Sequence, residues 1–162
     1  DGRKARRFDG KGCLDVPKSP SLDPSAGPLT VEVTLLAEGP DGAIVANGGK
    51  TNGYGLFVQD GKPGFVYNAA NKTTTLVADA PIVGRWATVT AQVSAERQVR
   101  LLVDGKQAAT KKLPAFIDRE PNDALQIGAD LRSPVIDKLP GFTGLIEHVR
   151  IYSGDPSAAA KK

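Results

Sequence analysis

Apolar and polar residues alternate with a period of two along much of this 162-residue chain. In residues 30–38 and 86–93, every second residue is apolar: Val31, Val33, Leu35 and Ala37, then Ala87, Val89, Ala91 and Val93. Because successive side chains of a strand point to opposite faces, these segments predict half-buried β-strands. No segment sustains the 3, 4 and 7 spacing of an amphipathic helix, so long helices are not expected.

Turn residues divide the remaining apolar segments into further short strands. Asp60-Gly61 separates residues 54–58 from 64–68, and Asp104-Gly105 separates 99–103 from 107–110. An Asp-Gly pair between two apolar runs is a favoured two-residue hairpin turn. Additional strands are expected at 43–46, at 125–127 and at the end of the chain. The two longer loops, Pro114 to Pro121 and Leu131 to Pro140, are the places where such scaffolds usually carry recognition residues.

Composition supports a fold rich in turns. The chain holds 18 glycines and 12 prolines, well above the roughly 12% of residues usual for the two together. Short strands at regular spacing with turns between them are typical of antiparallel sandwiches and barrels. The predicted fold is therefore all-β, an antiparallel two-sheet β-sandwich of the jelly-roll type.

The formal charge of +3 is concentrated at the two ends of the chain. Four basic residues lie in residues 1–7 and two at 161–162, which leaves 15 basic and 17 acidic residues in 8–160. We interpret 1–7 as a basic linker, 8–154 as one domain and 155–162 as a tail. Solvated tails of this kind do not indicate nucleic-acid binding. No run of about 18 apolar residues is present, so no membrane partner is expected.

The closing segment, 141–152, predicts a strand whose two faces differ. Val149 and Ile151 fall on one face, which we expect to join the core. Ile146, His148, Arg150 and Tyr152 then fall on the other face. Trp86 is expected in the core, and so is Cys13, the only cysteine, which can form no disulfide within the chain.

Several of these segments, in order, resemble laminin G-like domains of the concanavalin A-like superfamily. They are Phe8-Asp9-Gly10, Trp86 with its alternating strand, Leu102-Val103-Asp104-Gly105, Leu125-Gln126-Ile127-Gly128, and the Phe-x-Gly strand that ends in Arg150-Ile151-Tyr152. The resemblance implies a concanavalin A-like jelly roll with a lectin-like, non-catalytic role.

Residues 41–49 and 53–68 are also similar to the C-terminal region of bacterial arylsulfatases. This resemblance implies an accessory module of a secreted or periplasmic sulfatase-like enzyme, with the sulfatase catalytic domain as a partner. Calcium is a candidate cofactor on the concanavalin A-like scaffold, because Asp side chains and backbone carbonyls in neighbouring loops can provide the oxygen ligands it prefers. The candidate ligands by loop position are Asp9, Asp130, Asp137 and Glu147. Glu147 stands where the wider family has Asp in the closing strand.

The residue patterns of catalysis are missing, so no enzyme activity is expected. No Cys/Ser-x-Pro-x-Arg segment suits a sulfatase nucleophile, and the five glutamates are isolated rather than set as the close pair that glycosidases need. His148 is the only histidine, and no Gly-x-Ser-x-Gly elbow accompanies it.

The predicted function is carbohydrate binding, with sulfated or anionic polysaccharides as candidate ligands. The alternative is a structural module that packs on its parent catalytic domain without binding sugar. Arg150 offers planar donors for sulfate or carboxylate groups, flanked by His148 and Tyr152. Tyr54 and Asn68 are the candidates at an adjoining loop rim, although hairpin aromatics are as readily cross-strand core pairs.

Overall fold

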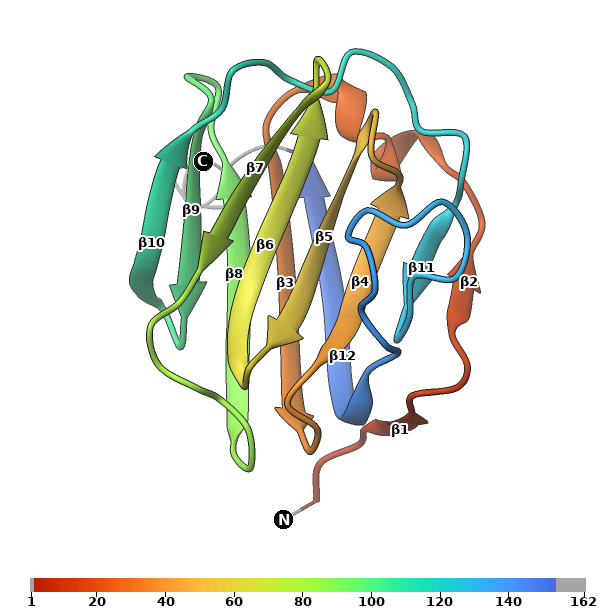
Figure 1. Ribbon diagram of the computed structural model, residues 1–162, viewed down its shortest axis with the longest axis vertical. Coiled ribbons are helices and arrows are strands. Elements are labelled where there is room, and N and C mark those ends of the chain that lie inside the picture. Colours follow the sequence, from red (N-terminus) through yellow and green to blue (C-terminus); the bar gives the residue numbers. More distant parts are fainter. Residues whose placement is uncertain (1, 154–162) are drawn as a thin grey trace.

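The computed structural model describes residues 2–153, which form two antiparallel sheets of six strands each (Figure 1). Two 3-10 turns, η1 (Pro20–Leu22) and η2 (Pro24–Ala26), precede the first long strand. The strands are β1 (Arg6–Asp9), β2 (Leu14–Val16), β3 (Leu29–Ala37), β4 (Gly42–Gly48), β5 (Gly53–Gln59), β6 (Lys62–Ala69), β7 (Lys72–Val77), β8 (Trp86–Val93), β9 (Gln98–Val103), β10 (Lys106–Lys112), β11 (Leu125–Ile127) and β12 (Thr143–Ser153).

Sheet A has the strand order β1-β12-β3-β8-β9-β10, and sheet B has the order β2-β11-β4-β5-β6-β7. The sheets face one another as the two layers of a sandwich, and β7 lies near β10 at one side (Figure 1). This arrangement confirms the predicted all-β sandwich. Within the described range, no helix is long and apolar enough to cross a membrane.

The core fills the space between the two sheets. The apolar parity of β3 and β8 points into it, as the alternation predicted, with Val31, Val33 and Leu35 fully buried. Sheet B contributes Tyr54 and Phe65, whose ring centroids lie 6.1 Å apart. The hairpin aromatics of β5 and β6 are therefore cross-strand core pairs rather than a surface platform.

A second apolar cluster lies on the outer face of sheet B. The loop of residues 131–140 crosses this face (Figure 1) and lays Val135 on Phe57 and Val66. Gly64 leaves room for the Phe57 ring, because a Cβ at position 64 would lie 2.3 Å from that ring. Both faces of β5 are buried as a result, with Gln59 its only exposed residue.

The predicted strands at 30–38, 86–93 and 125–127 and both Asp-Gly hairpins are confirmed. The short edge strands β1 and β2 and the polar strand β7 were not predicted. The expected start of the domain at residue 8 falls inside β1, which begins at Arg6 and pairs with β12.

Two residues lie on the opposite face from the one predicted. A bulge in the β12 pairing between Ile146 and His148 changes the parity of the strand, so Ile146 turns into the core while His148 stays outside. Trp86 was expected in the core but lies half-buried on the surface, where the Arg3 guanidinium sits 4.7 Å from its ring centroid.

Candidate functional site

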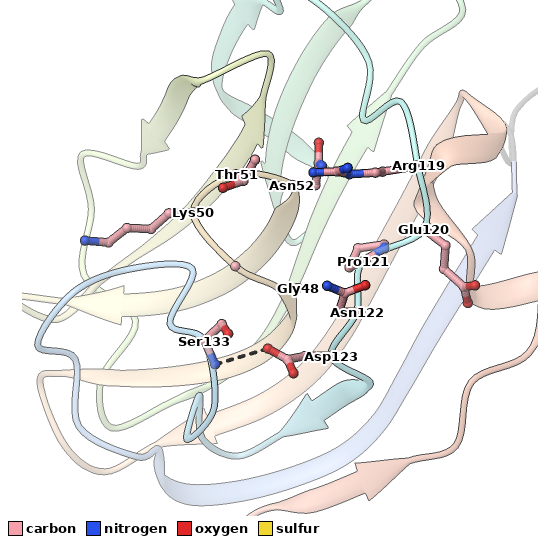
Figure 2. Close-up of a pocket in the computed structure, with 11 residues that line it drawn as sticks. Gly48, Lys50, Thr51, Asn52, Arg119, Glu120, Pro121, Asn122, Asp123 and Ser133 are labelled. Atoms are coloured by element: carbon pink, nitrogen blue, oxygen red, sulfur yellow. Dashed lines mark hydrogen bonds between the residues drawn. The ribbon is translucent and has the colours of Figure 1, made fainter.

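A polar pocket opens at the rim of the sandwich, where three loops meet (Figure 2). We call it the rim pocket. Its volume is about 200 Å³. The loop after β4 forms one wall, residues 119–123 form the second, and Ser133 of loop 131–140 closes the third.

Glycines allow the three loops to approach one another this closely. Gly48 has φ +86°, and a Cβ there would lie 2.3 Å from the Asn52 carbonyl oxygen and 2.7 Å from the Pro121 side chain. A Cβ at Gly49 would lie 3.0 Å from the Ser133 side chain. The Gly48-Gly49 pair therefore sets how near the other two walls can come to the hairpin loop.

Arg119 is the principal cation of the rim pocket. Its guanidinium lies beside the Asn52 side chain in Figure 2, and Nε donates to the Asn52 oxygen at 3.0 Å when the amide nitrogen donates to the Thr51 carbonyl. The two terminal nitrogens of Arg119 make no hydrogen bond to the described residues. They remain able to donate in parallel to a planar acceptor such as a carboxylate.

The second wall adds hydrogen-bond acceptors and donors. Asp123 accepts from the Ser133 backbone N–H at 3.2 Å, which fastens loop 131–140 to this wall (Figure 2). Asn122 and Glu120 also line the pocket. Lys50 forms an ion pair with Asp137 at the outer lip. An array of amide, carboxylate and guanidinium groups suits a ligand with many hydroxyl groups, because each hydroxyl both donates and accepts.

The four candidate calcium ligands do not form a cation site. Within residues 2–153 no three carboxylate, histidine or cysteine side chains come together as a metal-binding group. Asp137 pairs with Lys50, Glu147 with Arg3, and Asp9 accepts from the Lys11 backbone N–H. Asp130 accepts from the Val135 N–H at 2.6 Å, and burial raises the pKa of this carboxyl. Calcium needs six to eight oxygen ligands at one point, which these residues do not offer.

Tyr54 and Asn68 do not lie at an exposed rim, contrary to prediction. Both side chains are 0% exposed. Tyr54 belongs to the core, where burial raises the pKa of its hydroxyl. Asn68 donates to the carbonyls of Gly49 at 3.1 Å and Val135 at 3.2 Å. It therefore holds two of the rim-pocket loops in place from beneath, and Tyr54 has no access to a ligand.

His148, Arg150 and Tyr152 share the outer face of sheet A, as their spacing predicted. We call them the outer-face trio. The Arg150 side chain is 57% exposed and lies 3.8 Å from the Glu32 carboxylate. His148 lies 3.5 Å from the same carboxylate, and its Nε2 is 3.1 Å from the Thr34 hydroxyl. Tyr152 is 39% exposed. The trio is accessible, but Glu32 already neutralises part of its charge.

Sequence reasoning missed the rim pocket although it named two of its three loops, Pro114 to Pro121 and Leu131 to Pro140, as candidate recognition loops. Arg119, however, lies far in sequence from Asn52 and Ser133. The useful signal was the run Asn47-Gly48-Gly49, since paired glycines often mark a close approach of backbones.

The sequence profile of the family described as "Concanavalin A-like lectin/glucanases superfamily" matches residues 8–160. Solved structures share the fold at low identity. Domains LG4-5 of the mouse laminin alpha1 chain align at 20% identity with a TM-score of 0.73, over 92% of this chain and 41% of that one. The chain thus spans less than half of the laminin fragment.

The CBM40 domain of the Ruminococcus gnavus IT-sialidase, bound to alpha2,3 sialyllactose, aligns at 18% identity with a TM-score of 0.65, over 88% of this chain and 90% of that one. The binding domain of Paraclostridial Mosquitocidal Protein 1 aligns at 16% identity with a TM-score of 0.73, over 99% of this chain and 44% of that one. From the profile match and the two six-stranded sheets, the chain belongs to the concanavalin A-like lectin/glucanase superfamily.

Proposed function

We propose that this domain is a non-catalytic carbohydrate-binding module whose principal site is the rim pocket. The observation that carries the proposal is that the two terminal nitrogens of Arg119 have no partner among the described residues and share the pocket with the amide of Asn122 and the carboxylate of Asp123. The pocket, at about 200 Å³, is smaller than the roughly 300–1,000 Å³ of sites that enclose whole drug-sized ligands. It suits one residue of a longer glycan.

The polar lining fits a sugar better than an apolar ligand. Arg119 would donate to a carboxylate or sulfate substituent, and Asn122 would bond hydroxyl groups. The CBM40 structure of similar fold was solved with sialyllactose, a sugar that carries a carboxylate. This likeness supports the class of ligand proposed for the present chain.

The outer-face trio is the second candidate place for an anionic sugar. Arg150 is exposed and its contact with Glu32 is long, at 3.8 Å. A ligand sulfate could take the place of Glu32 as the partner of Arg150. The exchange would replace one charge pair with another, so the net gain in binding free energy is smaller than at Arg119.

We further propose that the module serves a larger secreted or periplasmic enzyme of the sulfatase type. The similarity of residues 41–49 and 53–68 to arylsulfatase C-terminal regions supports this assignment. In the alternative, the domain packs on its parent's catalytic domain and binds no sugar. That alternative predicts an exposed Arg119 with no ligand.

An array of neutral, carboxylated and sulfated polysaccharides, probed at low and moderate salt, tests the proposal. Saturable binding that persists at moderate salt supports a built site, because attraction by basic tails alone fades with screening. Arg119→Ala should abolish most of that binding in a protein that remains folded. Absence of binding to every glycan class would favour the structural alternative.

A further inference from the structure

Positive charge is distributed unevenly over the folded domain. Residues 71–113, which include strands β7 to β10, hold seven basic and three acidic residues, a net charge of +4. The other residues of 8–160 hold eight basic and 14 acidic residues, a net charge of −6. The nearly neutral total of residues 8–160 therefore conceals one basic segment of the sequence, residues 71–113.

The basic segment includes the edge where both sheets end. β10 is the last strand of sheet A, β7 is the last strand of sheet B, and the Lys111 ammonium bridges them by donating to the Thr75 carbonyl at 2.6 Å. Figure 1 shows β9 and β10 together at this side of the sandwich. We call it the β7–β10 edge.

Four cations gather at one end of this edge. The Lys112 ammonium donates to the Glu96 carbonyl, and the Arg97 guanidinium donates to the Pro114 carbonyl. The backbone pairs here too, because the Leu113 N–H donates to the Arg97 carbonyl at 2.8 Å. These bonds hold Arg97 and Lys112 together, and Arg100, which donates to the Gln92 side chain at 2.6 Å, faces Thr110 across the β9–β10 ladder. Lys111 follows Thr110 on the same strand and points to the opposite face, toward β7.

The cluster brings several basic side chains together with no carboxylate partner among the described residues. None of its four cations forms an ion pair with a described residue. Elsewhere Arg3, Arg7, Lys50, Arg85, Arg132 and Arg150 each pair with a carboxylate. Like charges held together without counter-charge raise the local potential, which attracts anions.

Lysines on an edge strand also prevent pairing with other chains, and this accounts for part of the pattern. It accounts for Lys111 and Lys112, which lie on β10 itself. It does not account for Arg97, which lies in the turn before β9, or for Arg100, which lies on the second strand from the edge. Edge protection alone therefore leaves half of the cluster unexplained.

We propose that the β7–β10 edge is a second site, which binds the backbone of a sulfated or carboxylated polysaccharide. The proposal rests on the proposed function and extends it to the class of polymer. Lys106 to Lys112 is seven residues of strand, a length of about 20 Å at the usual rise per residue. That length would accommodate several sugar units, with Gln107 placed between the cations to bond hydroxyl groups.

The chemistry of the edge favours a polysaccharide over nucleic acid or membrane. Residues 96–112 contain no aromatic side chain, and single-stranded nucleic acids are held largely by stacking on aromatics. Membrane-surface segments combine cations with bulky apolar anchors, but the side chains on β10 between its lysines are Gln, Ala and Thr.

The test uses the full chain and dextran sulfate as the probe, with neutral dextran, double-stranded DNA and anionic phospholipid vesicles as comparators. Lys111→Gln/Lys112→Gln should weaken dextran sulfate binding roughly tenfold at low salt, the scale of losing charge-assisted contacts. The matched control, Lys11→Gln/Lys138→Gln, removes two exposed cations elsewhere and should change the affinity by less than about twofold.

Each outcome separates the edge from the rim pocket. A large loss in the edge variant, with Arg119→Ala retaining much of the dextran sulfate affinity, supports the proposal. Equal effects of the edge variant and its matched control would overturn it, as would DNA or vesicles binding as tightly as dextran sulfate with the same dependence on the edge. If Arg119→Ala loses dextran sulfate binding and the edge variant does not, the edge site is ruled out but the proposed function still stands. Failure of every polysaccharide to bind would remove both.

Discussion

The rim pocket and the outer-face trio differ in whether their polar groups are already satisfied by the protein. In the trio, His148 and Arg150 both face the Glu32 carboxylate, at 3.5 and 3.8 Å. In the rim pocket, Arg119 uses only Nε to bond other residues of the described range 2–153. A group without an internal partner gains a full interaction from a ligand, whereas a paired group merely exchanges partners. The comparison teaches that exposure alone is a poor guide to a binding site.

The largest expected effect comes from adding a side chain at Gly48, where the loop after β4 closely approaches Pro121. Gly48→Ala places a Cβ 2.3 Å from the Asn52 carbonyl oxygen at φ +86°. We expect a loss of about 2–3 kcal/mol in the free energy of unfolding and loss of glycan binding. Urea denaturation and glycan titration measure the two effects.

Gly12→Ala is the matched control for Gly48→Ala, because nothing lies within 4 Å of a Cβ at that position. It should change the free energy of unfolding by less than about 0.5 kcal/mol. A Gly48→Ala protein as stable as this control would show that the loop contact is not needed.

The comparison itself is tested by a pair of arginine substitutions. Arg119→Ala should weaken binding of an anionic sugar by about 1.5–3 kcal/mol, the scale of a charge-assisted hydrogen bond. Arg150→Ala should weaken it by less than about 1 kcal/mol, because that guanidinium is already paired. Calorimetric titration of both variants decides the order. The opposite ranking would make the trio the main site.

A smaller effect is expected from removing the carboxylate that pairs with the outer-face trio. Glu32→Gln removes the carboxylate shared by His148 and Arg150. Anionic sugars should then bind the outer face up to about 1 kcal/mol more tightly, since Arg150 no longer has to exchange a partner. The gain should disappear in Glu32→Gln/Arg150→Ala. If Glu32→Gln alone changes nothing, the trio does not contact the ligand.

The smallest effect is a change in pH dependence at Asp130, which accepts from the Val135 N–H of loop 131–140. Burial raises the pKa of Asp130, so the folded state binds its proton more tightly than the unfolded state does. This carboxyl therefore stabilises the fold at low pH, and the contribution is lost as pH rises through the raised pKa.

The Asp130→Asn protein lacks this carboxyl, so it should not lose that stability as the pH rises. Between the ordinary and the raised pKa of Asp130, its free energy of unfolding should therefore rise more steeply with pH than that of the unmodified protein. Urea titrations of both proteins at a series of mildly acidic pH values measure the two slopes. Parallel slopes would show that Asp130 ionises alike in both states.

Local signals predicted those parts of the fold that local physics decides. Alternation identified β3 and β8, and the Asp-Gly turns identified two hairpins, because side-chain parity and turn conformation depend on neighbouring residues. The polar strand β7, with its run of threonines, lacks such a signal and forms by pairing with β6. Ile146 was misplaced because a bulge depends on the partner strand rather than on the sequence of β12.

The sites depended on contacts that the sequence does not display. Tyr54 faces the core between the sheets, and loop 131–140 buries the other face of its strand, so both faces of β5 are buried and alternation does not distinguish them. The rim pocket gathers residues from three distant segments. The trio was found because its members are two residues apart on one strand, although the Glu32 that pairs with it comes from β3.

The most direct test of the account is a backbone-amide NMR titration of the full chain with a glycan selected on the array. The account predicts that the largest shifts occur in residues 48–53 and 119–123 and at Ser133, and that they are lost in Arg119→Ala. Shifts centred on His148, Arg150 and Tyr152, with the rim-pocket amides unchanged, would contradict it.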